Sequence, residues 1–307
     1  MTKPIVSVAL MMLHEEGKFK LNDPVYKYIP EFKNLTVKKR KKTKPVKNHV
    51  KIIDLLRHSA GLNFKGPDDY RKVIDLSLEE YTKESIKSPL KFEPGTTWWY
   101  SYATDICGYL IEVLSQEKLD VFLKSRIFDP LEMNDTFFEL PNSKLDRLTT
   151  LYVVDENKEL VSFDNKTNTP FKDKVILLNG SGGLLSTTDD YLKFSFMLLN
   201  NGLYNEKQII KKETLDLMKE DHSLGLKYKK LAFGKKKGFG LGFEVVKEDG
   251  TKFGSKGTFG WGGMFGTYFR VDPKENMVFM YMTQSFETYK LKLAEKFRAL
   301  VYESIIE

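Results

Sequence analysis

A run of apolar residues close to the start of the chain constrains the fold more than any other feature. Residues 5–13 read IVSVALMML, and their apolar side chains point all round a helix instead of to one face. Pro4 suits the first turn of a helix, and Gly17 suits the position just after a helix end. A helix that is apolar on every side needs neighbours on every side. We therefore expect the core to be built around this segment.

The composition is that of a folded chain without a disulfide framework or a metal cluster. Apolar residues make up 41% of the 307 residues and charged residues 30%, which is typical of a folded chain and not of a disordered one. Cys107 is the single cysteine, and the four histidines are scattered. The run 5–13 is too short to span a bilayer. We expect no membrane span, no metal and no cofactor.

The pattern changes along the chain from helical to strand-like. Helices are predicted over 52–61, 103–115, 119–128, 188–200 and 211–219, with short polar helices within 70–88. Strands separated by Gly and Asp-Pro turns are predicted over 239–246, 253–259, 266–271 and 277–283, before an amphipathic helix over 287–306. The predicted fold class is therefore α+β, an antiparallel sheet flanked by helices with an inserted all-helical domain. We assign residues 1–22 and 220–307 to the sheet domain and residues 23–219 to the mostly helical one.

The segment 38–47, KKRKKTKPVK, is the most strongly charged part of the chain. A cluster of this kind suits a nucleic-acid or membrane patch, but it lacks the interleaved aromatic residues that nucleic-acid sites use. It also lies between two predicted helices. We interpret it as a solvated loop, and we expect no nucleic-acid partner.

Five motifs in order carry a resemblance to a known family. They are MTKP at the start of the buried helix, HSAGL at 58–62, PGTTWWYSYATDICG around Tyr100, GSGGLLSTTDD at 180–190 and FGWGGMFGTYFRVDP around Trp261. Their order and spacing resemble the serine β-lactamase and penicillin-binding-protein superfamily, most closely class C-like β-lactamases and family VIII carboxylesterases. The resemblance covers essentially the whole chain. It implies a β-lactamase/transpeptidase-like fold and a small-molecule ester or amide substrate.

The first motif of that family is Ser-x-x-Lys, and Met1-Thr2-Lys3 matches all of it except the serine. The resemblance places the serine directly before Met1, and it places a helix and two strands further upstream. We therefore expect an N-terminally truncated member of the family that lacks these N-terminal strands and is inactive as it stands. The alternative is a non-catalytic pseudoenzyme that keeps the cleft for binding a ligand.

Lys3 and Tyr100 are the expected catalytic residues. A serine and a lysine three residues apart lie on one face of a helix. Burial and the positive end of the helix dipole both disfavour a charged ammonium, so the first turn of a buried helix suits a neutral lysine base. Such a base activates the serine hydroxyl. The resemblance implies that Tyr100 passes the proton on to the leaving group.

The resemblance also assigns a substrate-binding strand. Trp261, Gly262 and Gly263 stand where the family has Lys-Thr-Gly or His-x-Gly, and glycines there let a substrate lie against the strand. The backbone N–H of Met264 would share the oxyanion hole with the N–H of the serine. Without a lysine at Trp261, we expect a weak grip on the carboxylate of a β-lactam or peptide.

Aromatic residues around Tyr100 favour ester chemistry. Trp98 and Trp99 are expected to wall an acyl or alcohol pocket together with Trp261. Tyr102 stands where penicillin-hydrolysing members usually have Asn, whose amide holds the β-lactam side chain. We therefore expect an esterase acting through an acyl-enzyme, with a β-lactamase or D-amino-acid peptidase as the alternative. His58 is expected to be structural, and 180–183 to form a tight turn that lines the cleft.

Overall fold

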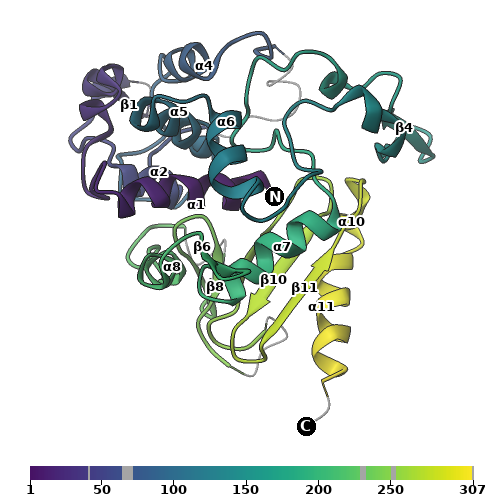
Figure 1. Cartoon of the computed structure of the whole chain (residues 1–307). Coiled ribbons are helices and arrows are strands. Elements are labelled where there is room, and N and C mark those ends of the chain that lie inside the picture. Colours follow the sequence, from purple (N-terminus) through teal and green to yellow (C-terminus); the bar gives the residue numbers. More distant parts are fainter. Residues whose placement is uncertain (41, 64–71, 229–232, 250–253, 306–307) are drawn as a thin grey trace.

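The apolar helix predicted near the start of the chain lies between two halves of the molecule (Figure 1). The computed structural model describes residues 1–40, 42–63, 72–228, 233–249 and 254–305. Helix α1 spans Thr2–Glu15, and every residue from Thr2 to Leu13 is buried. On the side that faces the helical half of the molecule, it packs against α5 (Ala103–Ser115). The expectation that the core surrounds this helix is confirmed.

The other helices of this half follow the predicted segments closely. They are α2 (Ile52–Leu56), α4 (Leu78–Ser85) and α6 (Leu119–Leu123), which one π-helical turn extends over Lys124–Phe128. Short 3₁₀ turns cover Val25–Lys27, Pro30–Asn34, Asn142–Arg147 and Pro170–Lys172. The helix predicted over 52–61 ends early because the backbone turns left-handed at His58, with φ of 56°. Residues 70 and 71 of the segment 70–88 lie outside the described residues.

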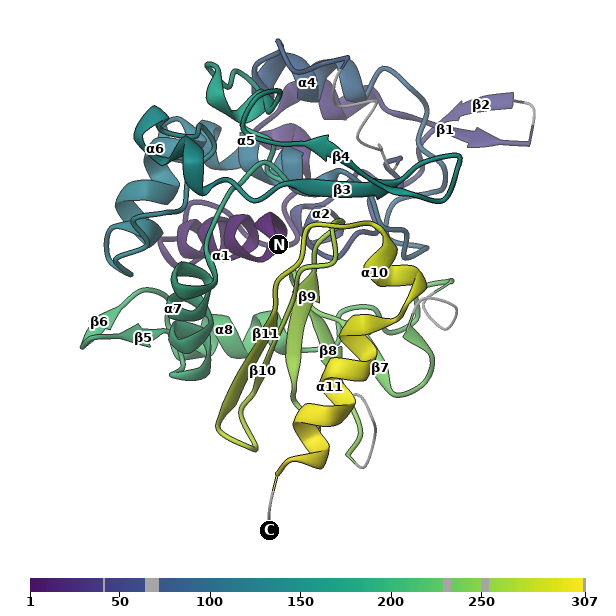
Figure 2. The same ribbon diagram turned by 90° about the vertical axis from the view of Figure 1, so that its right-hand side faces the viewer.

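Two β-hairpins project from the helical half (Figure 2). One pairs β3 (Leu151–Val154) with β4 (Leu160–Asp164). The other pairs β1 (Thr36–Lys39) with β2 (Lys42–Pro45), so the prediction of a loop over 38–47 is wrong. The lysine-rich sequence gives no alternation of apolar and polar residues from which strands could be recognised. Long-range backbone hydrogen bonds from Leu90 hold the first strand in place instead.

The second half is a five-stranded antiparallel sheet, as predicted. Its order is β11–β10–β9–β8–β7, with bounds Met277–Tyr281, Tyr268–Asp272, Phe259–Gly262, Glu244–Val246 and Lys237–Phe239. The strand predicted over 239–246 is two strands, because Gly242 takes φ of +97° and reverses the chain. The strand predicted over 253–259 begins only at Phe259, and residue 253 lies outside the described residues.

Alternating side chains of β10 bind a helix on each face of the sheet. The ring of Phe269 lies 5.0 Å from that of Tyr191 on α7 (Thr188–Leu199). On the opposite face, Arg298 of α11 (Leu293–Glu303) donates a 2.8 Å hydrogen bond to the Tyr268 hydroxyl. α7 therefore belongs to the packing of the sheet, although it lies within residues 23–219.

The remaining elements lie around this sheet (Figures 1 and 2). They are the short hairpin of β5 (Leu203–Tyr204) and β6 (Lys207–Gln208), helix α8 (Lys212–Lys219) and helix α10 (Glu287–Lys290). The helix predicted over 287–306 is thus two helices, because Lys292 takes a left-handed φ of 53° between them. Residue 306 lies outside the described residues. Within the described ranges, no helix has the length and apolarity needed to cross a membrane.

A glycine in the sheet half sets how closely α1 approaches the sheet. A Cβ added to Gly242 would lie 2.4 Å from the Cβ of Ser7, which is far inside van der Waals contact. Only glycine therefore lets this turn pack against α1, and the contact fixes the helix that carries Lys3.

We predict that Gly242→Ala destabilises the fold more than Gly225→Ala does. Both glycines have a positive φ, which costs an alanine about 1–2 kcal/mol. A Cβ at Gly225 meets nothing within 4 Å, whereas one at Gly242 collides with Ser7. At Gly242, the steric overlap lowers the free energy of unfolding by about 1–3 kcal/mol more. Urea unfolding of both variants measures the difference, and equal losses would show that the α1 contact does not constrain the fold.

Candidate active site

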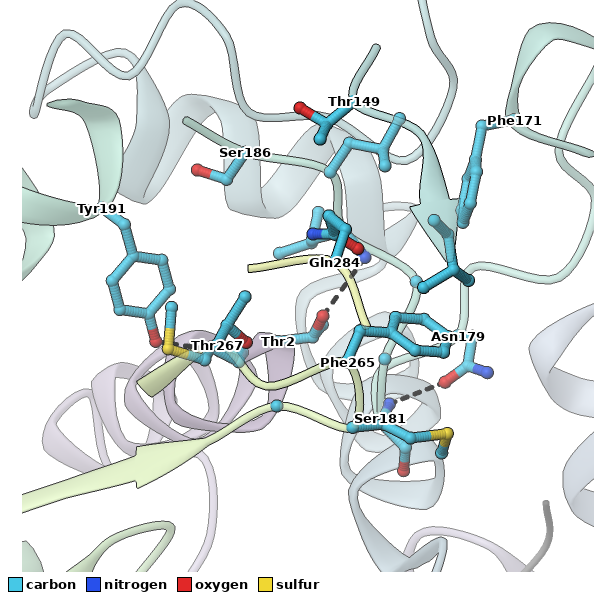
Figure 3. A pocket seen from close by; sticks show the side chains of 18 of the residues that line it. Thr2, Thr149, Phe171, Asn179, Ser181, Ser186, Tyr191, Phe265, Thr267 and Gln284 are labelled. Carbon is cyan, nitrogen blue, oxygen red and sulfur yellow. Dashed lines mark hydrogen bonds between the residues drawn. The ribbon is translucent and has the colours of Figure 1, made fainter. Parts of the chain in front are cut away.

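A single cavity of about 650 Å³ collects most of the residues that the sequence singles out. It lies at the start of α1 and is bounded by Tyr100, by the end of β9 and by a wall formed from residues 135–186. Figure 3 shows Thr2 and Ser181 at this cavity on separate segments, with Phe265 and Thr267 together on a further one. Of the nine candidate residues, it is lined by Lys3, Tyr100, Tyr102, Trp261, Gly262, Gly263 and Met264.

Lys3 and Tyr100 are in direct contact. The Lys3 side chain is buried, and its Nζ lies 4.7 Å from the centre of the Tyr100 ring. The same Nζ donates a 2.8 Å hydrogen bond to the carbonyl oxygen of Ser181. The Tyr100 ring also lies against Trp261, with ring centres 5.6 Å apart. An amine, a phenol and the predicted substrate strand thus meet at one point.

His58 packs beneath this group as a neutral ring. Its centre is 4.9 Å from that of Tyr100, and its Nδ1 lies 3.4 Å from the Ser101 hydroxyl. Burial lowers the pKa of His58 well below its usual value, and the nearby charge of Lys3 lowers it further. A ring that stays unprotonated adds no second positive charge beside Lys3.

The end of β9 lies directly against the start of α1. The Gly263 N–H donates to the Thr267 carbonyl at 2.7 Å, and the Gly266 N–H returns a 3.1 Å bond to Gly263, so the chain turns tightly here. A Cβ on Gly263 would lie 2.0 Å from the Thr267 hydroxyl and 3.1 Å from the backbone nitrogen of Met1. The glycine expected from the sequence is therefore required for the close approach of strand and helix.

A loop that the sequence marked only as a tight turn fixes Lys3. The Ser181 N–H donates to the carboxylate of Asp105 at 2.7 Å and to the side-chain oxygen of Asn179 at 2.9 Å. These bonds, of which Figure 3 draws the one to Asn179, hold the Ser181 carbonyl toward the Lys3 amine. Asp105 is fully buried on α5. The glycine-rich run signals the turn, but no local pattern reveals its partner 76 residues earlier in the chain.

Two further bonds tie the same region to the first residues of α1. The Leu184 N–H donates to the Thr2 hydroxyl at 3.2 Å, and the Tyr191 hydroxyl donates to the Met1 carbonyl at 2.9 Å. Sequence reasoning missed both, because each joins the helix start to a segment more than 180 residues away.

Trp98 and Trp99 do not wall the cavity. The Trp98 ring is buried between Phe233 and Phe239, with ring centres 4.5 and 5.6 Å away. The Trp99 side chain is 40% exposed, and the Lys91 Nζ lies 4.0 Å from the centre of its ring. A run of consecutive aromatic residues does not reveal which ring faces the cavity, so the expectation that both rings wall it fails here.

Tyr102 borders the cavity but keeps its hydroxyl away from it. That hydroxyl donates a 2.9 Å hydrogen bond to the Ser85 carbonyl, at the end of α4. Burial raises the pKa of the phenol, and the charge of Asp105 raises it further. Tyr102 therefore connects α4 to α5 and stays a neutral phenol.

The outer wall of the cavity is mostly apolar, but it includes Asp164 and a charged corner at Asp135. Its apolar lining residues in the segment 137–177 are Phe137, Leu140, Leu148, Leu151, Phe163, Phe171, Val175 and Leu177. At the corner, Asp135 accepts hydrogen bonds from Arg147 at 2.8 Å and from Lys144 at 2.6 Å. These two cations lower the pKa of Asp135 to about 2. Nowhere in the described ranges do three His, Cys, Asp or Glu side chains gather as metal ligands.

Comparisons with known proteins agree with this arrangement. The sequence model of the Beta-lactamase family matches residues 1–303. An uncharacterized protein of Mycobacterium tuberculosis (strain CDC 1551 / Oshkosh) is 29% identical over 305 residues, which cover 92% of this chain and 76% of the relative.

Solved structures share the fold over nearly the whole chain. EstCE1, described as a hydrolase with promiscuous acyltransferase activity, has a TM-score of 0.80 and 24% identity, covering 98% of this chain and 83% of its own. A D-stereospecific amidohydrolase from Streptomyces sp. has a TM-score of 0.68 and 19% identity, covering 96% of this chain and 84% of its own. The fold is therefore β-lactamase/transpeptidase-like, and the family match over residues 1–303 places this chain in the β-lactamase family of serine hydrolases.

Proposed function

We propose that the cavity is the active site of an esterase-like serine hydrolase that works through an acyl-enzyme on small apolar esters. One observation carries the proposal: Lys3, Tyr100 and the Gly262–Met264 segment line the same cavity at the start of α1. The family motif sets the nucleophilic serine one position before Met1. The proposal is therefore that a chain bearing serine there is active, and that the 307-residue chain alone is not.

In the proposed reaction, the serine oxygen attacks the ester carbonyl while the Lys3 amine accepts the hydroxyl proton. The N–H groups of the serine and of Met264 stabilise the negative charge on the carbonyl oxygen. Collapse of this intermediate breaks the bond to the alcohol, which takes the proton through Tyr100. Water then attacks the acyl-enzyme while its proton moves through the same residues in the reverse direction. The acid is released, and the serine regains its proton.

The surroundings of the site support an ester over a β-lactam. Trp261 offers no cation to a substrate carboxylate at the first position of the strand motif. The Tyr102 hydroxyl is engaged with Ser85 and does not offer the amide contacts of an asparagine. Amide hydrolysis is the second candidate, favoured by the structural likeness to a D-stereospecific amidohydrolase.

The apolar wall supports an acyl chain of several carbons. Eight apolar residues of the segment 137–177 line a cavity of about 650 Å³. Each methylene group buried there contributes about 0.8 kcal/mol. We therefore propose that the acyl chain lies along this wall, with the scissile carbonyl at Lys3 and Tyr100.

We predict that Lys3→Ala and Tyr100→Phe each lower ester turnover at least about 100-fold in a chain that carries serine directly before Met1. Each removes a group that moves a proton in the rate-limiting chemistry. Hydrolysis of a chromogenic butyrate ester measures the rates, and Tyr228→Phe is the control because its side chain is exposed and distant from the cavity lining. Turnover that survives both substitutions would contradict the assignment, as would equal turnover by the 307-residue chain.

We predict that Leu148→Trp shifts the substrate preference of the serine-bearing chain toward short acyl groups. A bulkier side chain on the wall removes room for the acyl chain, so kcat/KM for an octanoate ester falls at least about 10-fold relative to an acetate ester. Leu160→Trp is the matched control, since Leu160 is exposed on β4 and does not line the cavity. An unchanged ratio would show that the acyl chain lies elsewhere.

A further inference from the structure

The β1–β2 hairpin is strongly basic, and its described cations pair with no acidic side chain among the described residues. Seven of the ten residues 38–47 are lysine or arginine, and no acidic residue occurs between 38 and 53. The formal net charge of the whole chain is +7, so the rest of the chain sums to 7 − 7 = 0. The surplus positive charge of the protein is thus concentrated in this one hairpin.

The described cations of the hairpin are exposed and form no ion pairs with other described residues. Lys38, Lys39, Arg40, Lys42 and Lys44 are all exposed, and Figure 2 shows the hairpin standing away from the body of the molecule. Among the described residues, none of these five side chains forms a hydrogen bond or an ion pair. None of them lines the cavity of the candidate active site.

The hairpin carries this charge at a cost to its own stability. Its register places Lys39 directly opposite Lys42, and like charges in that position repel. Arg40 takes a left-handed φ of 56°, which a residue other than glycine adopts only under strain. A backbone hydrogen bond holds the first strand, since the Lys38 N–H donates to the Leu90 carbonyl at 2.8 Å. An external anion would relieve the repulsion.

An exposed tryptophan, Trp99, is connected to the first strand of the hairpin through the neighbouring residues Leu90 and Lys91. Leu90 is hydrogen-bonded to the first strand, and the adjoining Lys91 places its ammonium over the half-exposed ring of Trp99. Tryptophan at the edge of a basic surface is typical of proteins that sit at the boundary between water and lipid headgroups. Trp99 does not line the cavity, so the active site leaves it unexplained.

We propose that the β1–β2 hairpin and Trp99 form a docking surface for a membrane rich in anionic lipid. Lysine clusters of this size bind anionic bilayers through summed electrostatic attraction. Residues 36–47 contain no aromatic side chain to stack on bases and no asparagine or glutamine to read adenine. The lipid surface therefore fits better than a nucleic acid, and the contact is peripheral.

The test is sedimentation of the 307-residue chain with lipid vesicles. In about 0.1 M salt, we expect binding to phosphatidylcholine vesicles containing about 30% phosphatidylglycerol and none to phosphatidylcholine alone. The hairpin variant replaces five cations, Lys38→Gln, Lys39→Gln, Arg40→Gln, Lys42→Gln and Lys44→Gln. We expect it to bind at least about 10-fold more weakly.

A control variant separates the hairpin from the total charge. It replaces five exposed lysines that pair with acids elsewhere: Lys87→Gln, Lys124→Gln, Lys166→Gln, Lys212→Gln and Lys290→Gln. It carries the same net charge as the hairpin variant, and we expect it to bind like the unchanged chain. Equal loss in both variants would overturn the proposal, as would equal binding to neutral vesicles.

Two further readouts do not depend on the hairpin variant folding. Raising the salt several-fold should release the unchanged chain, because exposed charges are screened. Anionic vesicles should shift the tryptophan emission to shorter wavelength in the unchanged chain and in Trp98→Phe, but not in Trp99→Phe. Salt-resistant binding, or a shift that survives Trp99→Phe, would count against the surface. Tighter binding to duplex DNA than to anionic vesicles at equal salt would assign the hairpin to nucleic acid instead.

Discussion

Burial of the first helix on all sides is the constraint on which the rest of the structure depends. α1 packs against α5 on one side, and on the other it meets the turn at Gly242 so closely that no side chain fits between them. Its first residues, Met1 and Thr2, accept hydrogen bonds from Tyr191 and Leu184. A helix fixed in this way cannot shift or rotate freely. The amine of Lys3 is therefore held in one place without a carboxylate partner among the described residues.

Among the described residues, the polar contacts of Lys3 include no acidic side chain. Lys3 bonds to a backbone carbonyl, which carries no net charge, and Asp105 accepts a hydrogen bond from the Ser181 N–H of the same loop. His58 stays neutral because it is buried beside Lys3. The apolar wall extends from this point into the cavity. The amine therefore lies in a buried setting without an acidic partner among the described residues, which suits the role proposed for Lys3.

Motifs and periodicity were enough to predict the antiparallel sheet, the buried first helix and the convergence of Lys3, Tyr100 and Trp261 on one cavity. They failed where the deciding contact is distant in sequence. The bond from Ser181 to Asp105 is one case, and the hairpin held by Leu90 is another. The direction in which the Trp99 side chain points could not be predicted either, because a run of adjacent aromatic residues shows no periodicity that separates buried from exposed positions.

The most direct test of the central claim is to trap the nucleophile with an alkyl fluorophosphonate and locate the adduct by mass spectrometry. The account predicts one adduct, on a serine placed directly before Met1, and faster labelling there than in the same chain with Lys3→Ala. It predicts no adduct on the 307-residue chain under the same conditions. Labelling at another residue, such as Ser181, or equal labelling with and without the added serine would contradict it.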